Sequence, residues 1–193
     1  MNDFTFYFGL GWHHIISIGA LDHILFIVAL AAIYLFKDWK QVLVLVTAFT
    51  IGHSLTLALS VYDIVRVNSR LVEFLIPCTI IITSLFNLFQ HDFSKKTLRL
   101  NYFLALFFGL IHGLGFANTI RFMLSKDEKI GPGLFGFNAG LEAGQIVVVA
   151  IILSASFLMV DKLKLSRRWW VWALSGTSFL IAVLLAFQQA LEL

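Results

Sequence analysis

The chain has 193 residues, of which 60% are hydrophobic and only 13% are charged, and its mean hydropathy is +0.90. An ordinary soluble domain carries about 25% charged residues, so this composition excludes a typical soluble domain and indicates an integral membrane protein. The net charge of +3 does not indicate nucleic-acid binding, because the Lys and Arg residues lie in or beside short connections between apolar segments.

The apolar runs are continuous and about 20 residues long, which is the length of a membrane-spanning helix rather than of a barrel strand. We predict an all-α, polytopic membrane protein in which residues 1–193 form a single domain of six transmembrane helices. The first segment ends near Phe36 and starts anywhere from Phe4 to Gly19, and the others lie near 41–61, 71–90, 101–121, 134–160 and 169–190. Because the connections are short, sequence neighbours should be antiparallel neighbours in space.

Basic residues in the connections predict the orientation. The first, third and fifth connections hold Lys37, Lys40, Lys95, Lys96, Arg99, Lys162, Lys164, Arg167 and Arg168. The second and fourth hold the smaller set Arg66, Arg70, Arg121, Lys126 and Lys129. The positive-inside rule therefore places both termini on the outer side of the membrane.

Ionisable residues inside or beside the apolar runs are predicted to lie at a similar depth in the membrane. At about 1.5 Å per helical residue, they all fall between the middle of the membrane and its outer face. The candidates for a shared site are His14, Asp22, His23, His53, Glu73, His112 and Glu142. A lone charged group at the bilayer centre costs at least about 2.5–3.5 kcal/mol. Five helices each supply such a group, so mutual coordination or a shared metal ion is the simplest way to offset the cost.

His14 fits this site only if the first helix is broken. On a continuous helix, the eight residues between His14 and Asp22 separate them by about 12 Å along the axis. Gly19 provides a place for a break. Without that break, His14 would be a separate ligand on the path toward the site.

The residue types limit the metal. Imidazole and carboxylate groups without thiolates suit Zn²⁺, Ni²⁺, Co²⁺ or Fe²⁺ rather than Cu⁺, and so many histidines disfavour Mg²⁺. Cys78 is the only cysteine and lies in an apolar run, so no thiolate site is feasible. Other polar residues flank the candidate ligands and are predicted to support them: Thr50, Ser54, Asn138 and Gln145.

Structural roles are the alternative for each candidate. Asp22 and His23 could be an interfacial pair that reaches the lipid headgroups. His53 and His112 could be core histidines that are hydrogen-bonded to Thr50 or to a backbone carbonyl. Glu73 could be an acid favoured by a helix N-terminus.

Several stretches together resemble one family. The run HHIISIGALDHILFIVAL resembles the H-x₇-DH-x-LF signature of the HupE/UreJ membrane proteins, which are accessory to nickel hydrogenases and ureases. FTIGHSLTLAL, LVEFLIP, FGLIHGLGFA and FNAGLEAGQ resemble its later motifs in the same order, from about His14 to Gln145. The resemblance implies a bacterial cytoplasmic-membrane protein associated with uptake of nickel, and of cobalt in some cases. By motif position it implies the same seven functional residues, and nickel-enzyme maturation proteins as partners.

Two functions follow from these patterns. The first is a permease for nickel, cobalt or zinc; no G-x₄-GK[ST] motif is present, so a gradient or a cytoplasmic metal sink would drive it. The second is an intramembrane zinc hydrolase with Glu142 or Glu73 as general base, acting on a lipid or a membrane-embedded substrate. The absence of a visible polar path through the inner half favours the second. A structural subunit with a buried metal is a third reading.

Overall fold

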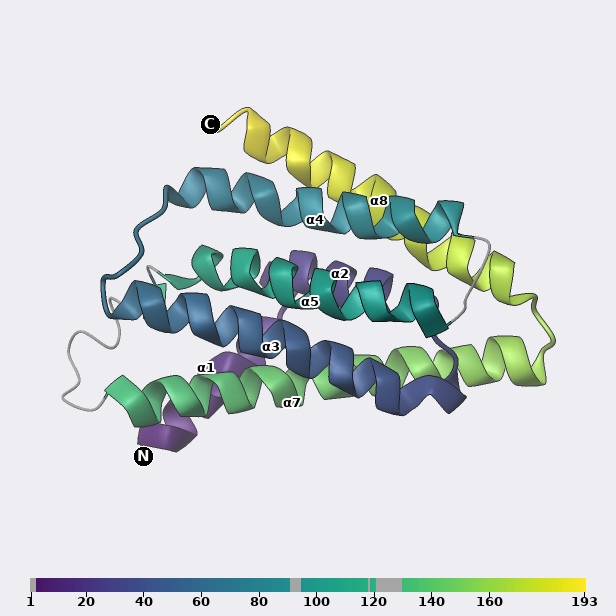
Figure 1. Cartoon of the computed structure of the whole chain (residues 1–193), viewed down its shortest axis with the longest axis horizontal. Coiled ribbons are helices and arrows are strands. Elements are labelled where there is room, and N and C mark those ends of the chain that lie inside the picture. The colour runs from purple at the N-terminus through teal and green to yellow at the C-terminus, as the bar shows by residue number, and fades with distance from the viewer. Residues whose placement is uncertain (1–2, 91–94, 118, 121–129) are drawn as a thin grey trace.

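The computed structural model describes residues 3–90, 95–117, 119–120 and 130–193 and shows helices that run along one long axis (Figure 1). They are α1 (Asp3–Ile16), α2 (Leu21–Ala31), α3 (Trp39–Val61), α4 (Ser69–Phe89), α5 (Lys95–Gly115), α7 (Ile130–Ser156) and α8 (Arg167–Ala190). Short turns η1 (Ile18–Ala20) and η2 (Phe36–Asp38) precede α2 and α3, and the π-helical turn η3 (Phe157–Lys162) extends α7. The described residues contain no β-strand, so the predicted all-α class is confirmed.

Most of these helices are long and apolar enough to cross a membrane. Helices α4 and α8 meet this criterion alone, as do α3 with η2 and α7 with η3. The pair α1 and α2 meets it only jointly, and the apolar part of α5, Asn101–Gly115, is shorter. The described residues therefore give four spans, or five with the bent pair, and the predicted count of six is not established. Phe89 and Phe103, with exposed fractions of 75% and 72%, show that the outside of the bundle is apolar, as lipid contact requires.

The helix ends lie close to the predicted ends, with two differences. The first apolar segment leaves the helical conformation at Ala31 rather than near Phe36, and α5 ends at Gly115. Residues 91–94 and 121–129 lie outside the described residues. They include Arg121, Lys126 and Lys129, which entered the prediction of orientation.

Helices α1 and α2 are separated by a sharp bend. Their axes meet at 68° across η1, where the N–H of Ala20 donates to the carbonyl of Ser17. Gly19 lies in this turn, so the break that His14 required is present. As a result, the imidazole rings of His14 and His23, one on each side of the bend, have centroids only 4.6 Å apart.

Glycine faces bring together helices that are not sequence neighbours. The closest pairs of this kind are α1 with α7 and α3 with α5, whereas α4 and α8 pack closely without a glycine contact. A Cβ atom at Gly140 would lie 2.0 Å from the carbonyl oxygen of Phe8, and one at Gly109 would lie 2.2 Å from that of Phe49. Only glycine permits such an approach of two backbones, and small residues drive helix association in membranes.

The two glycine-packed pairs join helices that run in the same direction. Gly140 lies against Phe8 and Gly144 against Ile15, so α1 and α7 run parallel. Helices α3 and α5 are parallel in the same way. Helices an even number of segments apart run parallel when consecutive helices alternate, so these directions agree with the predicted alternation. The glycine faces add close contacts between helices that are not sequence neighbours.

Both chain termini lie toward the same end of the long axis, and α4 and α8 lie side by side with opposite directions (Figure 1). The side of the membrane on which each terminus lies stays a prediction from the basic residues.

Candidate metal-binding site

A cavity of about 330 Å³ lies at the bend between α1 and α2. Residues of α1, η1, α2, α4 and α5 line it. Five of the seven predicted ligands are among them: His14, Asp22, His23, Glu73 and His112. Glu73 is exposed whereas His23 and His112 are buried, so the cavity leads from the surface to the histidines.

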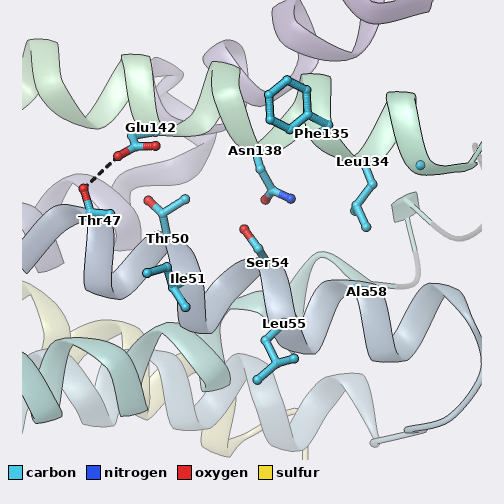
Figure 2. Close-up of a pocket in the computed structure, with 11 residues that line it drawn as sticks. Thr47, Thr50, Ile51, Ser54, Leu55, Ala58, Leu134, Phe135, Asn138 and Glu142 are labelled. Carbon is cyan, nitrogen blue, oxygen red and sulfur yellow. Dashed lines mark hydrogen bonds between the residues drawn. The ribbon is translucent and has the colours of Figure 1, made fainter.

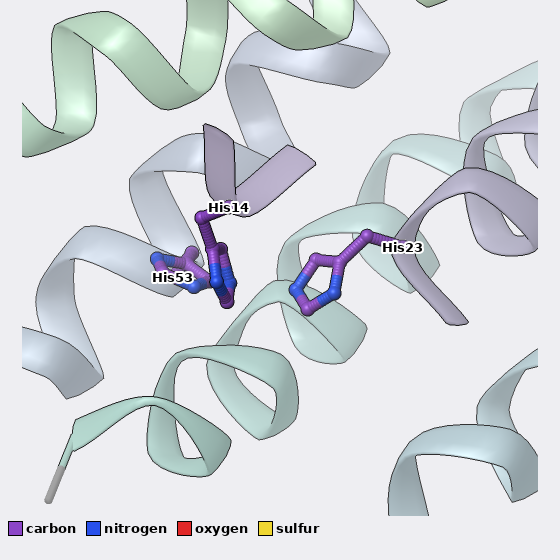
Figure 3. Close-up of side chains that lie close together, drawn as sticks. All are labelled: His14, His23 and His53. Carbon is purple, nitrogen blue, oxygen red and sulfur yellow. The ribbon is translucent and has the colours of Figure 1, made fainter. Parts of the chain in front are cut away.

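Three histidines from three helices converge beside this cavity (Figure 3). His14, His23 and His53 come from α1, α2 and α3, and each offers a ring nitrogen within 4.8 Å of the other two. Their ring centroids are 6.2 Å apart for His14 and His53 and 6.3 Å apart for His23 and His53. The His23 side chain is 4% exposed and that of His53 is fully buried. A single ion at the centre of the three rings would need only small side-chain adjustments to meet all of them.

Each of these three histidines has at least one buried ring nitrogen without a hydrogen-bond partner among the described residues. The buried unpaired atoms include Nε2 of His14, Nε2 of His23 and both ring nitrogens of His53. Thr50 does not pair with His53: its hydroxyl oxygen lies 3.1 Å from the Val46 carbonyl and 2.8 Å from Gln145 Oε1, which share its one proton as acceptors. A buried polar group without a partner costs about 1–3 kcal/mol. A metal ion would satisfy several of these nitrogens at once, so the donor set fits a divalent transition metal.

The Asp22–His23 pair is explained by its geometry. The Asp22 carboxylate oxygen Oδ1 lies 3.0 Å from Nδ1 of His23 and also accepts a hydrogen bond from the His23 backbone N–H at 2.8 Å. If Nδ1–H donates to the carboxylate, the lone pair is left on Nε2, the buried atom without a partner. Carboxylates hold metal-binding histidines in this way. This geometry suits Asp22 to orient His23, and its predicted role as a direct ligand stays a prediction.

His112 is oriented by a threonine that the sequence analysis missed. Its Nε2 lies 3.0 Å from the Thr79 hydroxyl, whose single proton is directed at the Ile76 carbonyl 2.7 Å away. With the hydroxyl proton on the Ile76 carbonyl, the hydroxyl oxygen accepts a hydrogen bond from the Nε2–H tautomer of His112. This leaves a lone pair on His112 Nδ1, which is buried without a partner, and the His112 ring centroid is 5.0 Å from that of His23. The only sequence signal was a polar residue two positions after Pro77 in an apolar helix.

Removing the Thr79 hydroxyl should weaken metal binding. Thr79→Val keeps the side-chain shape but frees the His112 ring, so we expect Ni²⁺ affinity to fall by about 10-fold to 100-fold, as for other residues that orient metal-bound histidines. Titration calorimetry on the detergent-purified protein measures this. Thr79→Ser retains the hydroxyl and should bind like wild type. Equal affinity in Thr79→Val would mean that His112 does not contribute to the site.

The structure does not bring Glu142 to the histidines. It lies in a separate groove of about 470 Å³ between α3 and α7, where its Oε1 accepts a hydrogen bond from the Thr47 hydroxyl at 2.8 Å (Figure 2). Ser54 and Asn138 line the same groove. Glu142 shares the predicted depth with the histidines, but it lies on a different side of α3.

The four residues predicted to support the ligands belong to this second region as well. Thr50, Ser54 and Asn138 line the groove. Gln145 accepts the Thr50 hydroxyl at 2.8 Å and ties α7 to α3. Thr47, which holds Glu142, is a further residue that the sequence analysis missed.

Neutralising Glu142 should therefore leave metal binding unchanged. We expect Glu142→Gln to keep Ni²⁺ affinity within about twofold of wild type, as for a substitution remote from the site. Glu73→Gln, which removes a carboxylate from the cavity itself, serves as the comparison and should bind Ni²⁺ more weakly. Loss of affinity in Glu142→Gln would restore this carboxylate to the ligand set.

Comparison with known proteins identifies the family of the chain. A family model described as "HupE / UreJ protein" matches residues 1–190, nearly the whole chain. Comparisons with curated proteins and with solved structures gave no match. The matched region contains every motif from His14 to Gln145 and all residues of the cavity. The chain belongs to the HupE/UreJ family.

Proposed function

We propose that the protein is a permease for divalent transition metals in the bacterial cytoplasmic membrane, with nickel favoured and cobalt or zinc as other substrates. The observation that carries this proposal is a set of three histidines from three different helices, each with at least one buried ring nitrogen that has no partner among the described residues. Family membership supports a metal-handling membrane protein, and the resemblance to nickel-associated accessory proteins supports nickel.

The donor set suggests how the ion would be selected. Imidazole nitrogens prefer borderline metals such as Ni²⁺, Co²⁺ and Zn²⁺, whereas Mg²⁺ and Ca²⁺ prefer oxygen ligands. Asp22 and Glu73 add negative charge to the cavity that leads to the histidines. Such charge raises the local concentration of cations and favours their capture.

The direction of transport follows from the predicted orientation. With both termini outside, the cavity lies in the outer half of the membrane and would receive the ion from the periplasm. Nickel-enzyme maturation proteins would then take up the ion in the cytoplasm and keep its free concentration low.

Transport by the purified protein tests the proposal. Proteoliposomes that contain the wild-type chain and an internal metal-sensitive dye should admit Ni²⁺ in a saturable manner and should not admit Mg²⁺. His23→Ala should abolish the influx, whereas His13→Ala, at an exposed position of α1, should not. The absence of Ni²⁺, Co²⁺ and Zn²⁺ influx in wild type would reject the permease.

A zinc-dependent intramembrane hydrolase is the second candidate. Glu73 lines the same cavity as His14, His23 and His112 and could serve as general base. Glu142 is a poor general base, since it lies in the separate groove. Elemental analysis after dialysis against a mild chelator separates the two functions. A hydrolase should retain about one zinc per chain, whereas a permease should release its ion.

A further inference from the structure

Buried polar side chains form a column along one face of α4, which begins at the histidines and runs away from them. Thr79, Thr83 and Asn87 recur every four residues, so they lie on one stripe of the helix. Their exposed fractions are 2%, 7% and 3%. The eight residues from Thr79 to Asn87 cover about 12 Å of the bundle axis. The column therefore occupies the half of the bundle that the histidines do not.

Hydrogen bonds join the column to its neighbours. Thr79 contacts His112, and the Thr83 hydroxyl donates to the Thr79 carbonyl at 2.8 Å. The Asn87 amide donates to the Ala29 carbonyl of α2 at 2.7 Å and to Ser175 of α8 at 3.2 Å. Buried polar groups thus recur at each turn of α4 from the His112 contact at Thr79 to the Ala29 and Ser175 contacts at Asn87.

The column continues beyond α4 through two buried residues. The Asn101 amide of α5 donates to the phenol oxygen of Tyr34 at 3.3 Å, and Tyr34 is fully buried. Tyr34 follows α2 in the chain, next to Ile33, whose carbonyl accepts a hydrogen bond from Arg167. Arg167 would have to move before a cation could leave at this end.

A small cavity lies within the column. Thr83, Asn87 and Asn101 line it together with apolar side chains, and its volume is about 10 Å³. That is roughly the room for the centre of one water molecule. Such a space is too narrow for a hydrated ion, so the column is closed in this conformation.

Packing alone does not account for this arrangement. Apolar side chains would fill the interior of a membrane bundle without the cost of burying amides and hydroxyls. The hydroxyl oxygens of Ser84 and Ser178 are also buried and have no partner among the described residues. The register that pairs Asn87 with Ser175 in antiparallel α4 and α8 brings Ser178 to the level of Ser84.

We propose that this column is the inner half of the translocation pathway, through which a partly dehydrated divalent metal ion passes from the histidines to the cytoplasmic side. The inference rests on the proposed permease function. Hydroxyl and amide oxygens bind borderline metals more weakly than imidazole does. The ion therefore moves from strong ligands to weak ones and is released rather than trapped. Opening requires α4 to separate from α2 and α5, the helices that close the small cavity.

Thr83→Val is the decisive variant. It removes a polar group from the pathway but breaks only a hydrogen bond within α4, so the fold should persist. We expect Ni²⁺ influx into proteoliposomes to fall by about tenfold or more, since the ion loses a polar partner in a desolvated passage. Ni²⁺ affinity in detergent and thermal stability should match wild type. Thr83→Ser should restore influx, and Ile82→Val, on the exposed face of the same helix, should leave it unchanged.

The other outcomes overturn the proposal in distinguishable ways. If Thr83→Val and Asn87→Leu both bind Ni²⁺ and transport it at the wild-type rate, the column is not the pathway, while the permease function stands. If Thr83→Val loses Ni²⁺ binding together with influx, the column belongs to the histidine site. If wild-type protein does not transport Ni²⁺, Co²⁺ or Zn²⁺, both the permease and the pathway are rejected.

Discussion

Replacing His53 with alanine is expected to abolish the binding of divalent transition metals while leaving the metal-free protein at least as stable as wild type. His53 is fully buried and both of its ring nitrogens are without a partner among the described residues. Loss of one of three imidazole ligands should reduce Ni²⁺ affinity by about 1,000-fold, which corresponds to about 4 kcal/mol.

The substitution is expected to lower metal affinity but not the stability of the metal-free protein, and both effects have the same cause. Without metal, the His53 imidazole is a buried polar group that gains no hydrogen bond, so its removal relieves a desolvation cost. A histidine with a purely structural role would stabilise the fold and its removal would lower the melting temperature. Titration calorimetry with Ni²⁺ and thermal melts with and without metal measure both quantities.

His13→Ala is the matched control for this experiment. His13 precedes His14 on α1 but is exposed and does not line the cavity. The His13→Ala variant should bind Ni²⁺ with wild-type affinity and melt at the wild-type temperature. If His53→Ala binds Ni²⁺ as tightly as His13→Ala, the three-histidine site is rejected.

Replacing Gly109 with alanine is expected to destabilise the bundle and to disturb the metal site with it. The added Cβ would lie 2.2 Å from the carbonyl oxygen of Phe49, a backbone atom that cannot rotate away. Helices α3 and α5 would have to separate, at a cost of about 3 kcal/mol. They carry His53 and His112, so Ni²⁺ affinity should fall as well.

Gly176→Ala provides the control. A Cβ atom at Gly176 meets nothing within 4 Å, and alanine favours a helix over glycine by up to about 1 kcal/mol. This variant should melt at or above the wild-type temperature. If Gly109→Ala melts at the same temperature as Gly176→Ala, the close contact of α3 and α5 is not present in the protein.

The depth of each residue in the membrane could be predicted from the sequence, because the rise per helical residue is fixed. This is why His14, His23, His53 and His112 converge as expected once the helix breaks near Gly19. The direction in which a side chain points around its helix was not accessible in the same way, since it depends on which helices pack together. Glu142 illustrates this: its depth matches the histidines, but α7 turns it toward Thr47 and away from them.

Helix partners could not be predicted for a related reason. Short connections decide whether consecutive helices alternate in direction, but they do not decide which faces are in close contact. Glycines such as Gly109 and Gly140 decide the latter, and their partners are backbone carbonyls that carry no sequence signal. Uncharged Thr79 and Asn87 were likewise overlooked, because attention to ionisable groups alone does not find amides and hydroxyls that lie along a helix face.

The glycine-packed pairs have a mechanical consequence. Pair α1–α7 supplies His14 and pair α3–α5 supplies His53, while His23 comes from α2, beyond the bend. An ion held by all three would be a removable cross-link between units that are each stiff because their backbones touch. Loading and unloading the ion would then lock and unlock the relative motion of the two pairs, and the bend at Gly19 would act as the pivot. The transported ion would itself control the relative motion of the helix pairs.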